Sequence, residues 1–524
     1  MAVSPRSAKT NPAPLKVHEH YSESGRWGSL VSNSPYFSET LASLPEEAFK
    51  GRVIAITGCT TGIGFHIARA ATLRGARGVL LLNRPSQRSV ACEQALRKVA
   101  PIGTEVQSID CDLISFDSVV AAATSVETKV RELKGSVGGG LDVLVNNAAV
   151  AWQLDERTEN CLEIQMQTNH ISHVLLVNLL LPSLEESSDD SALNSGNTRE
   201  RDTRSIKFRR ADSNVTDDSH NTDVKRHDGF GRIVWAGGLA VFSPALPLTA
   251  DYFAPSKAGG LGASKTALEA TLKPESSLKK PFGANHRGAM GSLKRTFYFT
   301  SDEEFEGSHI RYHMSKLACA AFALGLSSQL AESGSRVKSV MYDPGVSESR
   351  LAINAEMKRH KNVAAKSLLS RFMPCSGFAN KMTFDDAKSS CFGVQSPADG
   401  AASALMAAFA PDVNSGDVFA PSQSVSAREA SFSKSMVGGK YGKRNIVNGK
   451  GHPVRIIEAG SRNTIANVEP LPFLFALDDA NQTVCWNMSL QVIGITDFFI
   501  PRSISSPFIH ARTSDTASAE TRES

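Results

Sequence analysis

Short runs of apolar residues alternate with longer amphipathic stretches over the first third of the chain. The run Val53–Thr57 has the length and composition of a strand that is buried on both faces. The stretch Ile63–Arg74 repeats apolar residues at helical spacing and stops at Gly75. Further segments continue this alternation, with strands expected at 79–82, 105–109 and 142–146 and helices at 88–99 and 117–133. Strands that alternate with helices predict βαβ units and a parallel sheet.

Two polar stretches then interrupt the pattern, at about 185–230 and about 262–308. Neither contains enough apolar residues to form a core, so both are expected to be surface insertions. Strand-like runs return around and between them, at 232–236, at 337–341 and near 417–419, and a strong helix pattern covers 312–332.

The length of 524 residues would ordinarily suggest several domains, but the ordered patterns account for only one. We expect an α/β, doubly wound parallel sheet (a Rossmann fold) in a single domain with two large polar insertions. The expected parts are a disordered leader (1–47), the domain itself (48–434), a C-terminal extension (435–500) and a disordered tail (501–524).

Composition narrows the function classes. Lysine and arginine number 57 against 53 acids, with no concentrated basic stripe, so no nucleic acid is expected as a partner. The longest apolar stretch, Val174–Leu184, is broken by Asn178 and Pro182 and is too short to be a transmembrane segment. Eight scattered cysteines without paired spacing indicate reduced thiols. We therefore expect a cytoplasmic protein, with an organellar or a peripheral membrane location left open.

A glycine-rich turn joins the first predicted strand to the first helix. Gly58 permits a tight turn, while Gly62 and Gly64 let the backbone approach a pyrophosphate at the helix N-terminus. The expected cofactor-binding residues of this turn are Gly58, Thr60, Thr61, Gly62, Ile63 and Gly64.

Residues at the ends of the next strands suggest which dinucleotide binds. Arg84 stands near the place where an acidic residue would indicate NAD, and a guanidinium there pairs with a 2′-phosphate. Asp112, after the third strand, is placed to accept from the adenine amino group, and Asn146 ends the fourth strand at the ligand-binding edge. The expected cofactor is therefore NADP(H).

These motifs, in this order, resemble the short-chain dehydrogenase/reductase superfamily. The residues that carry the resemblance are TGCTTGIG (57–64), Asp112-Leu113, NNA (146–148), Asn169, the YxxxK motif Tyr312–Lys316, and Pro344-Gly345. The stretches 169–173 and 312–318 are similar to the retinol dehydrogenase and protochlorophyllide reductase branch. That resemblance implies NADP(H) dependence, lipophilic substrates in many members, and cofactor contacts from Leu113, Pro344 and Gly345.

The expected reaction interconverts a carbonyl and an alcohol by hydride transfer. Tyr312 would be the general acid/base, because Lys316 lies one turn away on the same helix face and its ammonium lowers the phenol pKa. By the resemblance, Lys316 also holds the nicotinamide ribose, and Asn169 holds a water that relays the proton. A small carbonyl or alcohol substrate is the expected partner, and a homodimer is left open.

Two features complicate this interpretation. Tyr252 and Lys257 lie nearer the fifth strand, but their YxxxxK spacing turns Lys257 away from Tyr252 by about 100° on a helix, and Pro255 disfavours a helix. Gly238 stands where the superfamily has a serine that hydrogen-bonds the reacting oxygen. The alternative function is therefore a catalytically impaired NADP(H)-binding regulatory or scaffold protein.

The remaining candidate sites are supported by less specific sequence signals. His170 and His173 could be metal ligands, but packed histidines on a core helix are the preferred interpretation, so no metal site is expected. Asn214-Val215-Thr216 matches a glycosylation sequon, which we take as chance in the absence of a secretory signal.

Overall fold

The computed structural model describes residues 34–135, 139–151, 153, 156–188, 231–238, 248–253, 303–345, 347, 395–422, 451–457 and 478–499. Their strands form one eight-stranded sheet with the order β3-β2-β1-β4-β5-β6-β7-β8. The strands are β1 (Val53–Thr57), β2 (Gly78–Asn83), β3 (Glu105–Asp110), β4 (Val143–Asn146), β5 (Arg232–Ala236), β6 (Lys338–Tyr342), β7 (Val418–Pro421) and β8 (Pro453–Ile457).

Neighbouring strands from β3 to β7 pair in parallel, and β8 is an antiparallel edge strand on β7. The register joins Ile54 to both Val79 and Val143, which places β1 at the centre. Strands β1, β2, β4, β5 and β7 are buried at every position, as expected for strands covered on both faces. The predicted doubly wound parallel sheet is confirmed.

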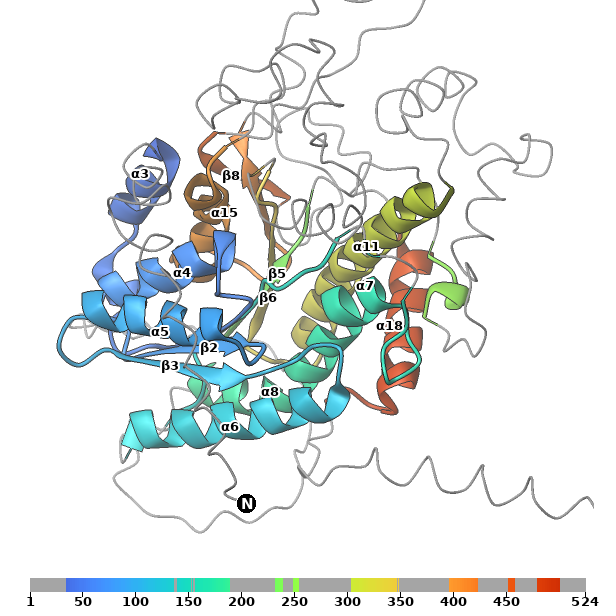
Figure 1. Ribbon diagram of the computed structural model, residues 1–524, viewed down its shortest axis with the longest axis horizontal. Helices are drawn as coiled ribbons and strands as arrows, with labels where there is room; N and C mark the ends of the chain where they lie inside the picture. Colours follow the sequence, from blue (N-terminus) through green and yellow to red (C-terminus); the bar gives the residue numbers. More distant parts are fainter. Residues whose placement is uncertain are drawn as a thin grey trace, which may run out of the picture.

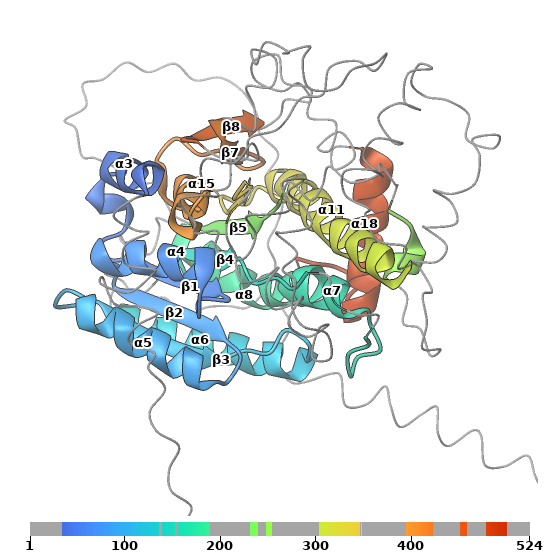
Figure 2. The same cartoon turned by 45° about the horizontal axis from the view of Figure 1, so that its top comes forward.

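Helices cover both faces of the sheet (Figures 1 and 2). One face carries α3 (Pro35–Ser43), α4 (Gly62–Leu73), α5 (Gln87–Val99) and α15 (Pro397–Phe409). The other carries α6 (Phe116–Lys134), α8 (Ser172–Ser188), α11 (Glu303–Glu332) and α18 (Asp479–Ile493). Short elements complete the described part: α7 (Ile164–Met166), a π-helical turn (Gln167–Ile171) and the 3-10 turns Glu46–Ala48 and Ala250–Tyr252.

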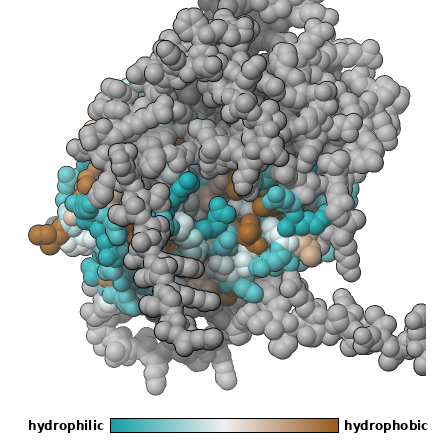
Figure 3. All heavy atoms as spheres, viewed as in Figure 1, coloured by the Kyte–Doolittle hydropathy of each residue, from teal (hydrophilic) through white to brown (hydrophobic). Residues whose placement is uncertain are grey.

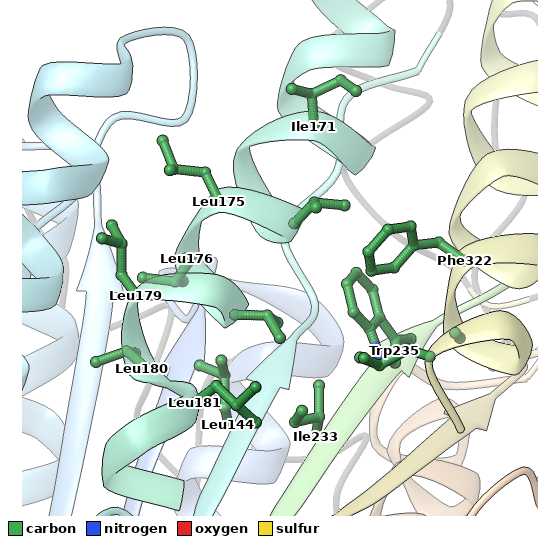
Figure 4. Close-up of a cluster of buried hydrophobic side chains, with 14 of the residues drawn as sticks. Leu144, Ile171, Leu175, Leu176, Leu179, Leu180, Leu181, Ile233, Trp235 and Phe322 are labelled. Carbon is green, nitrogen blue, oxygen red and sulfur yellow. The ribbon is translucent and has the colours of Figure 1, made fainter. Parts of the chain in front are cut away.

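Branched aliphatic side chains fill the space between α8 and the central strands (Figure 4). Leu175 and Leu176 of α8 and Leu144 of β4 are fully buried in this cluster. Trp235 of β5 packs against Phe322 of α11, with ring centroids 5.7 Å apart. This packing holds α8 and α11 against the same face of the sheet, α8 on β4 and α11 on β5 and β6.

The structure differs from the expected division of the chain in its leader, and it shows how the C-terminal extension packs. The leader was expected to be disordered up to residue 47, but α3 forms inside it and buries Phe37. The C-terminal extension contributes to the main core, because α18 buries Cys485 and stacks Trp486 on Phe322 with ring centroids 4.9 Å apart. Helix α8 continues to Ser188, past the start expected for the first insertion at about 185, and α11 begins at Glu303, before the end expected for the second at about 308. The rest of both insertions and the tail (501–524) lie outside the described residues.

The described surface that faces the viewer in Figure 3 is mainly hydrophilic, with small apolar spots. The exposed large apolar residues of the described part are Leu73, Val90, Val99 and Ile102. None of the helices in that part is both long and apolar enough to cross a membrane. The six cysteines within the same ranges carry no disulfide bond.

Candidate active site

The strand order brings the predicted site residues to one edge of the sheet. The chain reverses direction across the sheet between β1 and β4, and ligands of such folds bind beside the carboxyl ends of the strands at that switch point. The glycine turn follows β1, Asn146 ends β4, and Gly238 comes two residues after β5.

The glycine turn (residues 57–64) has the shape of an anion cradle. Gly58 and Gly62 have φ angles of +71° and +66°, which only glycine adopts readily. A Cβ at Gly64 would lie 2.4 Å from the carbonyl oxygen of Gly58, so the turn requires glycine there, whereas the space beside Gly62 is open. Helix α4 begins at Gly62, and no side chain caps it. Its first backbone N–H groups can therefore bind an anion in that space.

The ends of β2 and β3 border the same cradle. The side-chain oxygen of Asn83 accepts a 2.7 Å hydrogen bond from the backbone N–H of Cys59 and so ties β2 to the glycine turn. Arg84 follows directly and is exposed. Asp112 is half-buried, and its Oδ1 accepts from the backbone N–H of Ile114.

Asn146 provides a direct test of whether the site fits a dinucleotide. Only 3% of its surface is exposed, and both polar atoms of its side chain lack a hydrogen-bond partner among the described residues. Buried polar atoms are rarely left unsatisfied in proteins. An amide that can both donate and accept at this edge fits the polar groups of a nucleotide, so the residues present fit the cofactor.

Helix α11 carries the YxxxK motif to the same edge. The ammonium of Lys316 is buried and donates a 3.0 Å hydrogen bond to the carbonyl oxygen of Ala236, the last residue of β5. Burial lowers the pKa of Lys316 and raises that of Tyr312, and the Asp343 carboxylate raises both. The expected lowering of the Tyr312 pKa by Lys316 is not found, because burial, Asp343 and Cys319 all raise that pKa.

Asn169 lies in the π-helical turn, and its whole side chain is engaged. Its oxygen accepts from the backbone N–H of Val150 at 2.7 Å, and its nitrogen donates to Val150 O and to Ser315 Oγ, both at 2.9 Å. The hydroxyl of Ser315 in turn donates to the Tyr312 carbonyl at 2.7 Å. Asn169 therefore joins the loop after β4 to α11, and its backbone carbonyl is engaged as well.

That carbonyl belongs to a network which the sequence did not reveal. It accepts from His173 Nδ1 at 2.9 Å, while His173 Nε2 lies 2.9 Å from the hydroxyl of Thr57. Burial lowers the pKa of His173 to about 4, so the ring is neutral and Thr57 donates to it. Thr57 also accepts from the backbone N–H groups of Asn147 and Ala148. The glycine turn and Asn169 are thus linked through one histidine.

Residues at the end of β6 and just after it lie at the same edge of the sheet. Tyr342 donates through its hydroxyl to Asn147 Oδ1 at 2.9 Å, and Asn147 Nδ2 donates to the carbonyls of Thr57 and Gly58. Gly345 has a φ of +63° and donates its N–H to Asp343 Oδ1. Pro344 contributes its carbonyl, which accepts from Ser347 and Gln395. Leu113 is buried, and its carbonyl accepts from Ser172.

The competing candidates lie elsewhere or serve packing. Tyr252 is buried in a short 3-10 turn, and Lys257 lies outside the described residues. His170 is buried with a pKa lowered to about 3, and its Nε2 lies 2.7 Å from Ser489 Oγ of α18. The described ranges contain no group of three or more residues that could hold a metal ion.

Comparisons with known proteins agree with this architecture. A family model described as short chain dehydrogenase matches residues 52–195. An uncharacterized oxidoreductase of Schizosaccharomyces pombe is 31% identical over 140 residues, which are 27% of this chain and 38% of that protein. A protochlorophyllide reductase of Marchantia paleacea is 34% identical over 137 residues, or 26% of this chain and 28% of that protein. This chain therefore spans well under half the length of these relatives.

Among solved structures, the L-sorbose reductase of Gluconobacter frateurii complexed with NADPH and L-sorbose aligns with a TM-score of 0.40 and 13% identity. The alignment covers 71% of this chain and 96% of that one. The matched segment 52–195 contains the first four strands of the sheet and the glycine turn. On that segment, the chain is similar to the short-chain dehydrogenases.

Proposed function

We propose that this chain is an NADP(H)-dependent oxidoreductase that interconverts a carbonyl and an alcohol. The observation that carries the proposal is that α11, which bears Tyr312 and Lys316, is hydrogen-bonded through Lys316 to the end of β5 and through Ser315 to Asn169. NADP(H), when bound, supplies or accepts the hydride. The glycine turn would hold its diphosphate, Asn146 its nucleotide portion and Arg84 its 2′-phosphate.

In this proposal, Tyr312 transfers the proton. Because burial raises its pKa, the phenol is protonated at neutral pH and suited to donate to a carbonyl oxygen. Lys316, fixed against Ala236, would hold the ribose beside the phenol, and Asn169 would keep the loop after β4 in register with the catalytic helix.

The proposed substrate class rests only on sequence similarity to known proteins. The relatives include a polyprenol dehydrogenase of Danio rerio, 32% identical over 146 residues, as well as the protochlorophyllide reductase. Together with the resemblance of residues 169–173 and 312–318 to the retinol dehydrogenase branch, these names support a lipophilic carbonyl compound. The domain boundaries, a cytoplasmic location and a homodimer stay predictions.

Gly238 supports a second candidate, an NADP(H)-binding regulatory or scaffold protein. Glycine has no side chain with which to polarise a carbonyl, and loss of one such donor costs about 10²–10³ in rate. To distinguish the two, purified protein is incubated with NADPH and a panel of aldehydes, ketones and retinoids while NADPH absorbance is followed. Oxidation of NADPH with at least one compound supports the enzyme. Tight NADPH binding without oxidation on the whole panel supports the scaffold.

A further inference from the structure

A buried ion pair lies one residue before the candidate acid/base. Arg311 is 3% exposed, and its Nε is 3.3 Å from Oε1 of Glu163. The same guanidinium donates through Nη2 to the carbonyl oxygen of Gln153 at 3.0 Å. Arg311 therefore contacts both the segment before α7 and the loop after β4.

Glu163 has a second task at the same place. Its Oε2 accepts from the backbone N–H of Met166 at 2.7 Å and so caps α7, which leads directly into the π-helical turn with Asn169. Helices α7 and α11 lie side by side in both views (Figures 1 and 2). The Glu163 carboxylate thus caps the short helix before the Asn169 turn and also forms an ion pair with the helix that carries Tyr312.

A pair of this kind contributes more to geometry than to stability. Removing two charges from water offsets much of their attraction, and two apolar residues often replace a buried pair without loss of stability. The contact with Glu163 is an ion pair, whereas the hydrogen bond from Nη2 to Gln153 also fixes the direction of the planar guanidinium. Arg311 holds Glu163 and Gln153 at once, so it sets how the two segments that flank the Asn169 side chain meet the catalytic helix.

We propose that Arg311 and Glu163 are positioning residues that hold Tyr312 and the Asn169 turn in register. The inference rests on the proposed function, because the register matters only if Tyr312 transfers a proton. Displacement of a catalytic group by about 1 Å can cost about 10² in rate.

The decisive variant is the double change Arg311→Met with Glu163→Gln. It leaves no unpaired buried charge, and glutamine can still accept from Met166 N–H, so the protein should fold even where the single variants do not. Its thermal unfolding temperature and its Kd for NADPH should stay near the wild-type values. We expect kcat for NADPH oxidation to fall by about 10- to 100-fold and amide exchange across residues 164–171 to become faster. Arg311→Lys should recover part of the lost kcat.

The matched control is Arg131→Met, which breaks the exposed pair of Arg131 with Glu127 on α6 and should leave kcat and exchange unchanged. A double variant with wild-type kcat and an unchanged unfolding temperature overturns the proposal. If the wild type itself turns over no compound, the proposed function fails. In that case amide exchange across residues 164–171 is the only test of the positioning role. Exchange in the double variant equal to that of the wild type overturns it.

Discussion

The ammonium of Lys316 is hydrogen-bonded to the carbonyl oxygen of Ala236, two residues before Gly238. Helix α11 is therefore fixed to the strand end that precedes Gly238. The neighbouring carboxylate is that of Asp343, which favours the charged form of Lys316 against the effect of burial. If the proposed function holds, Gly238 and Asp343 are therefore the two positions at which substitution should change the rate or its pH dependence most directly.

Gly238→Ser should restore the missing donor. Since removal of one such donor costs about 10²–10³, we expect kcat for carbonyl reduction to rise by at least about tenfold. Gly238→Ala is the matched control, because it adds a Cβ without a hydroxyl. The measurement compares the steady-state rates of the wild type and the two variants. Equal rates for the serine and alanine variants would mean that position 238 does not face the reacting oxygen.

Arg84→Ala should change the preference between the two nicotinamide cofactors. A charge-assisted hydrogen bond to a phosphate contributes about 1.5–3 kcal/mol, so the Kd for NADPH should rise by about 10- to 100-fold. The Kd for NADH should stay unchanged, because NADH has no 2′-phosphate. Titrations followed by nicotinamide fluorescence measure both constants. A parallel weakening of both cofactors would exclude 2′-phosphate recognition by Arg84.

Asp343→Asn should move the pH dependence of alcohol oxidation. The Asp343 carboxylate raises the pKa of Tyr312, so its neutralisation lowers that pKa. Oxidation requires the phenolate as base, and the rising limb of log kcat against pH should therefore shift toward lower pH. The limb is measured at saturating cofactor and alcohol. A shift toward higher pH would contradict the assignment of Tyr312 as the base.

His66→Leu should reduce the loss of stability in mild acid. Burial between Phe37 and Phe65 lowers the pKa of His66 to about 3, against about 6.5 in an unfolded chain. The stabilisation by the neutral ring is complete above the unfolded pKa and is lost as the pH falls toward the folded one. Between pH 7 and pH 5 the wild type should lose about 2 kcal/mol through this residue. Urea unfolding at both pH values measures the difference, and an equal loss in the variant would refute the account.

The sequence predicted the sheet closely because its central strands are buried on both faces and appear as continuous apolar runs. The strand expected at Val53–Thr57 has these bounds in the structure, and the one expected at 232–236 matches β5. The glycine turn and the helical YxxxK motif could also be identified in the sequence, because local backbone geometry and helix spacing dictate which residues stand there.

The contacts around the site join residues far apart in the chain and leave no local pattern. Asn169 contacts Ser315 of α11, and Arg311 contacts Glu163. Helix α3 was missed for a related reason. It buries only Phe37 and Thr40, which is too short an apolar stripe to show helical periodicity.

The most direct measurement of the central claim compares wild type and Tyr312→Phe in NADPH oxidation with the best carbonyl substrate of the panel. The variant loses only the phenolic hydroxyl. We expect kcat to fall by about 10²–10⁴, the range typical of general acid catalysis, while the Kd for NADPH stays within about twofold. Equal kcat values for the two proteins, with NADPH bound equally well, would contradict the assignment of Tyr312 as the proton donor.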